Sequence, residues 1–203
     1  MNLPDDYLSI KNQFGPFEIK EKGSKFISFI FPAHSKEDAE NIILQLRKKY
    51  FDSTHICYAF RIGEGIEDYF RYSDDGEPGG TAGLPIYKEI SGKGLYNILT
   101  AVIRYYGGTK LGTGGLTRAY SGSAKLAIEN SLTKRIINVK KISLTINYNF
   151  LGELMKMVEL FGISISDQSY NEKGIFFELS IPLSLFQKFK KDISNRSNGK
   201  ISI

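Results

Sequence analysis

A glycine-rich segment near the middle of the chain carries two cations among its glycines. It reads RYYGGTKLGTGGLTRAYSG from Arg104 to Gly122, and an amphipathic pattern predicts a helix that begins near Leu116. A glycine turn that runs into a helix leaves backbone N–H groups unpaired at the positive end of the helix dipole. We therefore predict a site for phosphate, nucleic acid or another anion, made by Arg104, Gly107, Gly108, Lys110, Gly112, Gly114, Gly115, Arg118 and Lys125.

Common nucleotide-binding motifs do not match this segment. Gly107 to Gly112 has the glycine spacing of a Walker A loop, but Thr113 and Gly114 stand where Lys and Ser or Thr are required. A dinucleotide fingerprint beginning at Gly112 fails because Thr117 occupies its third glycine position. A second interpretation stays open, in which the glycines only allow tight turns and close helix packing.

An acidic segment precedes the basic one. Between Gly63 and Pro78 the acids are Glu64, Glu67, Asp68, Asp74, Asp75 and Glu77. Opposite charge predicts that Asp74, Asp75 and Glu77 face Lys110 and Arg118 in one site. As an alternative, these three carboxylates hold Mg²⁺ for an enzyme acting on a small phosphorylated or anionic substrate. Asp-Gly and Glu-Pro are equally typical of turns.

His55 and Cys57 lie two apart on a predicted strand, and hence on one face of it. A Cys-His nucleophile needs an exposed, activated thiol and a third, orienting group, and an alternating strand favours a packed pair instead. We predict no catalytic residue, no metal ligand and no cofactor.

The first two thirds of the chain predict an α+β domain. Gly15 to Pro32 has the pattern of a hairpin, and Ser35 with Asp38 resembles the capping box of a helix. Further elements are expected as strands at 54–62 and 68–72, a short helix at 84–90 and a buried strand at 97–106.

From about residue 136 the elements become shorter and follow the order β-α-β-β-α-β, which ends on the strand KISI. This order is that of a ferredoxin-like domain, so we predict two domains, 1–135 and 136–203.

Composition indicates a folded cytoplasmic protein. The chain has 203 residues, 41% hydrophobic residues and a net charge of +5, too mild to identify a nucleic-acid binder by itself. Cys57 is the only cysteine, which favours a reducing compartment. The N-terminal residues lack the pattern of a secretory signal, and no apolar run is long enough to span a membrane.

Four segments together resemble the IMPACT family, whose bacterial branch is called YigZ-like. They are SKFIS from Ser24, HICYAFR from His55, SDDGEPGGTAGLPI from Ser73 and VIRYYGGTKLGTGGLTRAYSGSA from Val102. Gly79 departs from the family pattern, which often has Ser or Ala there. The resemblance implies a first domain similar to domain 2 of ribosomal protein S5 and a second similar to the last domain of elongation factor G.

Because such domains occur in proteins that work on ribosomal RNA, and eukaryotic members regulate translation, the resemblance implies a role linked to translation. We predict a non-enzymatic factor that binds RNA or a ribosome-associated protein, with the Mg-dependent enzyme and a protein-interaction module as alternatives. Tyr105, Tyr106 and Tyr120 are candidates for stacking on bases, although the patterns place at least two of them in the core. The sequence does not define the oligomeric state.

Overall fold

A computed structural model describes residues 6–63, 69–172, 174–201 and 203. The chain forms two compact units, Tyr7–Ile136 and Ile137–Ile203, and Asp6 groups with the second. Among the described residues there are five α-helices together with two-, three- and five-stranded sheets. None of the described helices has the length and apolar character needed to cross a membrane.

The first unit is built on an antiparallel five-stranded sheet in the order β2-β3-β6-β4-β5. Its strands are β2 (Phe14–Glu21), β3 (Ser24–Pro32), β4 (His55–Ile62), β5 (Tyr69–Ser73) and β6 (Ile98–Tyr105). Strand β6 lies at the centre and is buried over Ile98–Arg104, because helices cover both faces of the sheet. The predicted hairpin and buried strand are confirmed. Asp68, where the fourth expected strand was to begin, lies outside the described residues.

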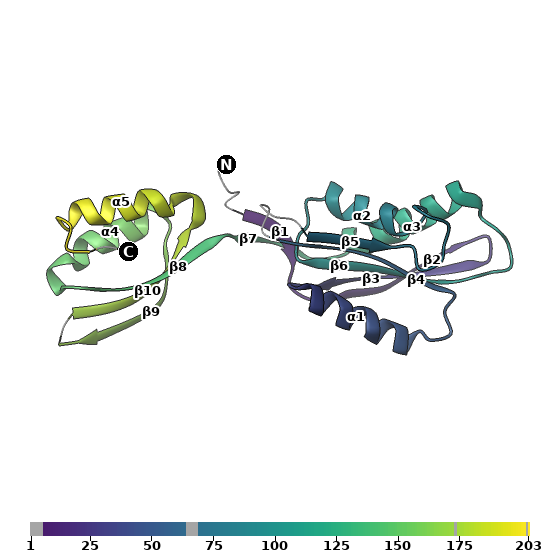
Figure 1. Cartoon of the computed structure of the whole chain (residues 1–203), viewed down its shortest axis with the longest axis horizontal. Helices are drawn as coiled ribbons and strands as arrows, with labels where there is room; N and C mark the ends of the chain where they lie inside the picture. Colours follow the sequence, from purple (N-terminus) through teal and green to yellow (C-terminus); the bar gives the residue numbers. More distant parts are fainter. Residues whose placement is uncertain (1–5, 64–68, 173, 202) are drawn as a thin grey trace. The chain divides into compact units, whose positions relative to one another are not determined.

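Helices cover the two faces of this sheet unequally. Helix α1 (Lys36–Lys49) packs on one face, and helices α2 (Gly83–Gly92) and α3 (Gly112–Glu129) pack on the other (Figure 1). The capping box is confirmed, since the Ser35 side chain accepts a hydrogen bond from the Asp38 N–H and the Asp38 carboxylate accepts one from the Ser35 N–H. Two hydrophobic clusters result, one on each side of the sheet.

The sequence did not predict two short strands, β1 (Asp6–Ile10) and β7 (Thr133–Ile137), which pair as a separate two-stranded sheet. Most side chains of β7 are exposed. The strand therefore lacks the alternation of apolar and polar residues by which strands are recognised.

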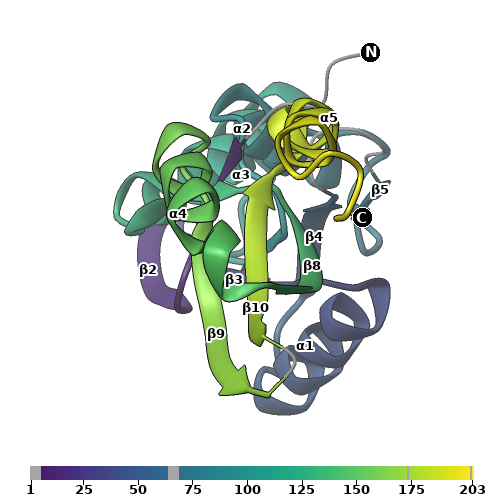
Figure 2. The same cartoon turned by 90° about the vertical axis from the view of Figure 1, so that its left-hand side faces the viewer.

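The second unit has the strand order β8-β10-β9, with both pairs antiparallel. It comprises β8 (Val139–Ile146), a 3-10 turn (Tyr148–Phe150), α4 (Leu151–Leu160), β9 (Ser164–Asn171), β10 (Gly174–Pro182), a second 3-10 turn (Leu183–Leu185) and α5 (Phe186–Arg196). Figure 2 shows this sheet with α4 and α5, which share one hydrophobic cluster with it.

The prediction of a last strand at KISI is wrong for its described residues. Lys200, Ile201 and Ile203 belong to no strand, and the side chains of both isoleucines pack against the hydrophobic cluster of this unit. After α5 ends, the chain turns through Gly199, whose φ is +77°, and the two isoleucines are used in packing rather than in strand pairing. The described part of this unit is therefore β-α-β-β-α.

Candidate functional site

The glycine-rich segment begins with a close contact between two backbones. A Cβ placed on Gly107 would lie 1.9 Å from the carbonyl carbon of Gly23, in the turn between β2 and β3. The Gly107 N–H donates to the Ser24 hydroxyl at 3.2 Å. Gly107 is therefore a packing glycine whose N–H is already used, which corrects its place among the predicted anion-binding groups.

Helix α3 begins at Gly112, four residues before the predicted start. Gly112 has φ +73°, a backbone conformation that a side chain would oppose. Leu111 precedes the helix and supplies no capping hydrogen bond, and the first turn contains no acid. Gly112, Gly114 and Gly115 thus belong to the first turn of the helix, where the N–H groups have no capping side chain.

The predicted cations lie at different distances from this helix start. Lys110 is exposed and immediately precedes it. Arg118 is exposed in the second turn of α3, where the effect of the helix dipole has declined. Its Nη1 lies 3.5 Å from the position that a Cβ on Gly114 would take, so the side chain extends back toward the helix start.

Lys125 lies apart from these groups. It is about 20 Å farther along α3 than Gly112, from the helical rise per residue, and pairs with Glu129 at 3.9 Å. The structure therefore does not bring Lys125 to the helix start. Gly108 is exposed in the loop just before Lys110.

A cavity of about 350 Å³ lies beside the start of α3. Lys110, Gly112 and Thr113 line it together with Tyr106, and so do Arg104 and Glu77. Of the three predicted acids, Glu77 lines the same cavity as Lys110, whereas Asp74 and Asp75 are not among its lining residues.

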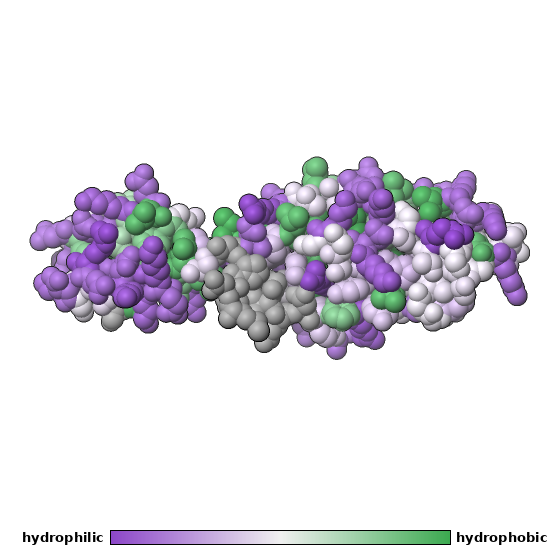
Figure 3. All heavy atoms as spheres, turned by 90° about the horizontal axis from the view of Figure 1, so that it is seen from above, coloured by the Kyte–Doolittle hydropathy of each residue, from purple (hydrophilic) through white to green (hydrophobic). Residues whose placement is uncertain are grey.

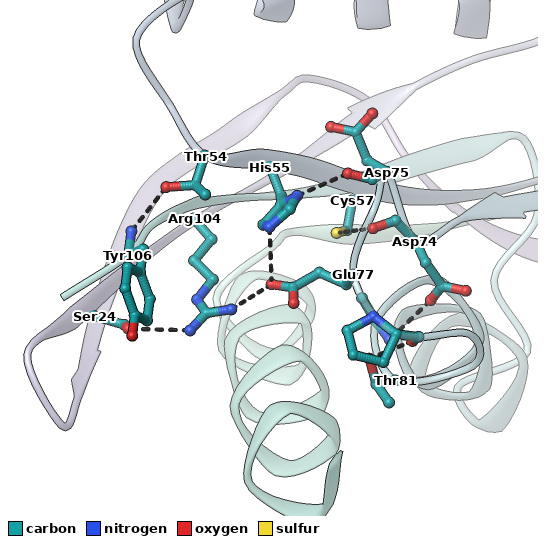
Figure 4. A network of polar contacts seen from close by, with 12 residues as sticks. Ser24, Thr54, His55, Cys57, Asp74, Asp75, Glu77, Thr81, Arg104 and Tyr106 are labelled. Atoms are coloured by element: carbon teal, nitrogen blue, oxygen red, sulfur yellow. Dashed lines mark hydrogen bonds and ion pairs between the residues drawn. The ribbon is translucent and has the colours of Figure 1, made fainter. Parts of the chain in front are cut away.

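Arg104 and Glu77 form the centre of a buried polar network (Figure 4). Arg104 Nη1 donates to Glu77 Oε1 at 2.6 Å, and its Nη2 donates to the Ser24 hydroxyl at 3.2 Å. The Tyr120 hydroxyl donates to the same Glu77 oxygen at 2.7 Å. Arg104 is only 4% exposed. Its two terminal nitrogens are engaged by Glu77 and Ser24 within the protein.

His55 and Cys57 belong to the edge of this network and not to a nucleophilic pair. His55 Nε2 lies 3.8 Å from Glu77 Oε1, and its Nδ1 is 2.7 Å from the Asp75 carbonyl oxygen. The Cys57 thiol is buried and donates to the Asp74 carbonyl oxygen at 3.0 Å. Burial raises the pKa of Cys57, which opposes formation of a thiolate nucleophile.

The carboxylates of Asp74 and Asp75 stabilise the acidic segment from within. Asp74 accepts hydrogen bonds at 2.8 to 2.9 Å from the N–H groups of Gly80, Ala82 and Gly83, at the start of α2. The Asp75 carboxylate accepts hydrogen bonds from the Ile56 N–H and from the Arg47 guanidinium, both at 2.6 Å. The hydrogen bond with Asp75 raises the pKa of Arg47.

The three carboxylates therefore have separate protein partners. In the part of the chain that the structure describes, no three His, Cys, Asp or Glu side chains are grouped to hold a metal ion. Glu64, Glu67 and Asp68, the other acids noted in the sequence, lie outside the described residues.

Sequence reasoning missed the parts of the site that come from distant strands. Ser24 hydrogen-bonds to Arg104 and to Gly107, which lie 80 and 83 positions away in the sequence. Thr113 lines the cavity from the first turn of α3. Ser24 begins the SKFIS segment, so its place in a family-like motif was the available signal.

The fold and site define a two-unit α+β protein in which a glycine-rich, uncapped helix start lies beside a buried ion pair. Residues 22–128 match the family described as the Impact N-terminal domain. The chain belongs to the IMPACT family. It is 31% identical to an IMPACT family member of Haemophilus influenzae, over 92% of this chain and 91% of that protein.

Two further similarities extend over nearly the whole chain. The chain is 29% identical to the IMPACT family member YvyE of Bacillus subtilis, over 97% of this chain and 89% of that protein. A solved structure described as that of a hypothetical protein has a TM-score of 0.69 and 27% identity, and the match covers 99% of this chain and 98% of that one. Both units of the chain thus have counterparts in these relatives.

Proposed function

We propose that this chain is a non-enzymatic cytoplasmic factor that binds RNA, in a role linked to the regulation of translation. The observation that carries the proposal is the start of α3, where first-turn N–H groups without a capping side chain lie next to Lys110. Backbone N–H groups at a helix start and lysine are both common ligands of nucleic-acid phosphates. Arg118 extends back over the first turn and adds a guanidinium to the same end of the helix.

The surface above α2 and α3 supports a polar ligand. In this view of the first unit, hydrophilic, near-neutral and hydrophobic residues are intermixed, and no extended hydrophobic patch is seen (Figure 3). Large contiguous apolar patches on a protein surface mark sites that bind proteins or membranes. The buried Cys57 thiol and the engaged His55 ring support a non-enzymatic role, because neither is arranged as a nucleophile and its base.

We further propose that each unit has the domain type that the sequence resemblance implies, a ribosomal protein S5-like first domain and a ferredoxin-like second domain. The order β8-β10-β9, with α4 between β8 and β9, supports the second assignment. It is the arrangement of the first three strands in a split β-α-β unit.

Titration of the full chain with fluorescent RNA at several salt concentrations tests the proposed function. Affinity should fall steeply as salt rises, because lysine and arginine displace counterions from the phosphates. Lys110→Glu and Arg118→Glu should each weaken binding by about 1–3 kcal/mol and reduce the salt slope by about one, with the melting temperature nearly unchanged. Lys48→Glu on α1, which covers the opposite face of the sheet, is the charge-matched control.

Two results would contradict RNA binding at this site. The first is affinity that stays constant between low and moderate salt. The second is unfolding of the first unit by Arg118→Glu while Lys110→Glu changes neither stability nor binding, which would make the glycine-rich segment purely structural. A partner that stays bound after nuclease treatment would instead favour the protein-interaction alternative.

A further inference from the structure

The cavity beside α3 is lined by two chemically different kinds of group. Lys110 and the backbone of Gly112 and Thr113 lie at the helix start, which attracts negative charge. The rest of the lining includes the Tyr106 ring and the apolar side chains of Leu111 and Leu116. A ligand complementary to both kinds of group has a compact anionic group joined to a flat or apolar one.

Cavity volume limits the size of this ligand. At about 350 Å³ it lies near the lower end of the range for small-molecule sites and is too small to hold a peptide helix, whose diameter is about 10–12 Å. In an RNA duplex the bases are stacked and paired, so only an unpaired nucleotide can place its base in a cavity of this size.

Tyr106 is suited to stacking on a base. Its side chain is 47% exposed although its backbone is fixed, since the Tyr106 N–H donates to the Thr54 hydroxyl at 2.9 Å. The Arg104 guanidinium lies 5.4 Å from the centre of the Tyr106 ring. Aromatic rings and guanidinium planes are the surfaces on which proteins stack unpaired bases.

Arg104 and Glu77 also leave polar atoms for the edge of a base. The Tyr120 and Arg104 hydrogen bonds and the approach of His55 all involve Glu77 Oε1, so Oε2 carries none of these contacts. Arg104 Nε is buried without a hydrogen-bond partner in the described structure. Buried donors without partners are rare in folded proteins and call for an explanation, which an acceptor atom of a bound ligand would supply.

We infer that this cavity binds one unpaired nucleotide of single-stranded RNA, with its base against Tyr106 and its phosphate at Lys110 and the start of α3. The inference rests on the proposed function and deepens it. Phosphate contacts do not read the bases, whereas a base in the cavity selects the single strand.

The test compares a fluorescent single-stranded RNA of mixed sequence with its duplex, using the full chain at one salt concentration. Tyr106→Ala should weaken single-strand binding about 5- to 150-fold, the range that base–aromatic stacking supplies, and leave duplex binding unchanged. Tyr106→Phe should retain the affinity. Thr113→Phe, which places a bulky group in the cavity without changing charge, should also remove the preference for the single strand. Tyr170→Ala, at an exposed tyrosine of the second unit, is the control.

Failure of this inference can be separated from failure of the proposed function. RNA binding that is salt-dependent but equal for both RNAs, and insensitive to Tyr106→Ala and Thr113→Phe, would overturn the nucleotide site and leave phosphate binding intact. If the chain bound neither RNA, both the nucleotide site and the proposed RNA-binding function would be overturned. Nucleoside monophosphates that stabilise the chain, while the single strand has no preference over the duplex, would assign the cavity to a free nucleotide and overturn the RNA inference.

Discussion

Arg104 and Glu77 form an ion pair in which the side chains are only 5% and 4% exposed. Removing one partner from a buried pair leaves an uncompensated charge in a medium of low polarity. Arg104 contacts Ser24 and Glu77 within the protein and also lines the cavity, so its position is compatible with a structural role and with a ligand-binding role. Its substitution therefore distinguishes a structural role from a ligand-binding one.

We predict that Arg104→Met lowers the free energy of unfolding by about 3–5 kcal/mol, because Glu77 stays buried without its cation. Adding Glu77→Gln should recover part of this loss, since the amide keeps an acceptor for Tyr120 without a charge. Urea denaturation of both variants measures the effect. If Arg104→Met left stability unchanged and abolished RNA binding, Arg104 would be a ligand-binding residue and not a structural one.

Because of Cys57 and Tyr120, we predict that the stability of the first unit depends on pH in the alkaline range. Burial is the main cause that raises the pKa of each group. In the unfolded chain these groups lose their protons near about pH 8.5 and 10, whereas in the folded protein they stay protonated to higher pH. The unfolded state therefore binds fewer protons above about pH 8.5, and stability falls as pH rises, by at most about 1.4 kcal/mol per pH unit for each group.

The measurement is the free energy of unfolding between neutral pH and about pH 10, for the wild-type chain and Cys57→Ala. Relative to the wild type, the variant should lose less stability above about pH 8.5, because it lacks one of the two groups. The same thiol should stay unreactive toward alkylating reagents until the first unit unfolds. Rapid labelling of the folded protein at neutral pH would show that Cys57 is not buried as described.

At the scale of elements, two glycines of the α3 region have opposite roles. The backbone of Gly107 contacts the β2–β3 turn, whereas Gly122 lies within α3 and has open space where a Cβ would lie. We predict that Gly107→Ala destabilises the chain by about 1–3 kcal/mol because the two backbones must separate. Gly122→Ala should stabilise it by about 0.5–1 kcal/mol through helix propensity. Thermal denaturation of both variants checks this, and a loss of stability in Gly122→Ala would argue against a regular helix there.

Elements specified by local chemistry could be predicted from the sequence. Ser35 and Asp38 are three residues apart, so the capping box was visible directly, and the apolar run through β6 predicted a buried strand. The start of α3 was placed too late because glycine disfavours helices, yet Gly114 and Gly115 lie in the first turn of α3. In the candidate site, the network of Glu77 with Arg104 and Tyr120 joins residues 27 and 43 positions apart, and such pairs depend on strand order rather than on spacing.

At the scale of the whole molecule, each unit contains its own hydrophobic clusters. The two clusters of the first unit use residues between Ile10 and Ile128, and the cluster of the second uses residues between Ile142 and Ile203. No cluster of the described residues combines side chains from both units. This division is the physical basis for proposing that the first unit folds alone.

We predict that a fragment of residues 1–137 folds cooperatively and keeps the salt-dependent RNA affinity of the full chain. A fragment that ends at Arg135, where the sequence placed the boundary, should be less stable because it removes Ile136 and Ile137 from β7, the partner of β1. A fragment of the second unit, 138–203, should melt at a lower temperature than 1–137, because a domain of only 66 residues buries a smaller share of its surface. Circular dichroism melts compare the three fragments, and RNA titration compares 1–137 with the full chain. A molten 1–137 fragment would refute independent folding, whereas a folded fragment that had lost its RNA affinity would assign essential phosphate contacts to the second unit.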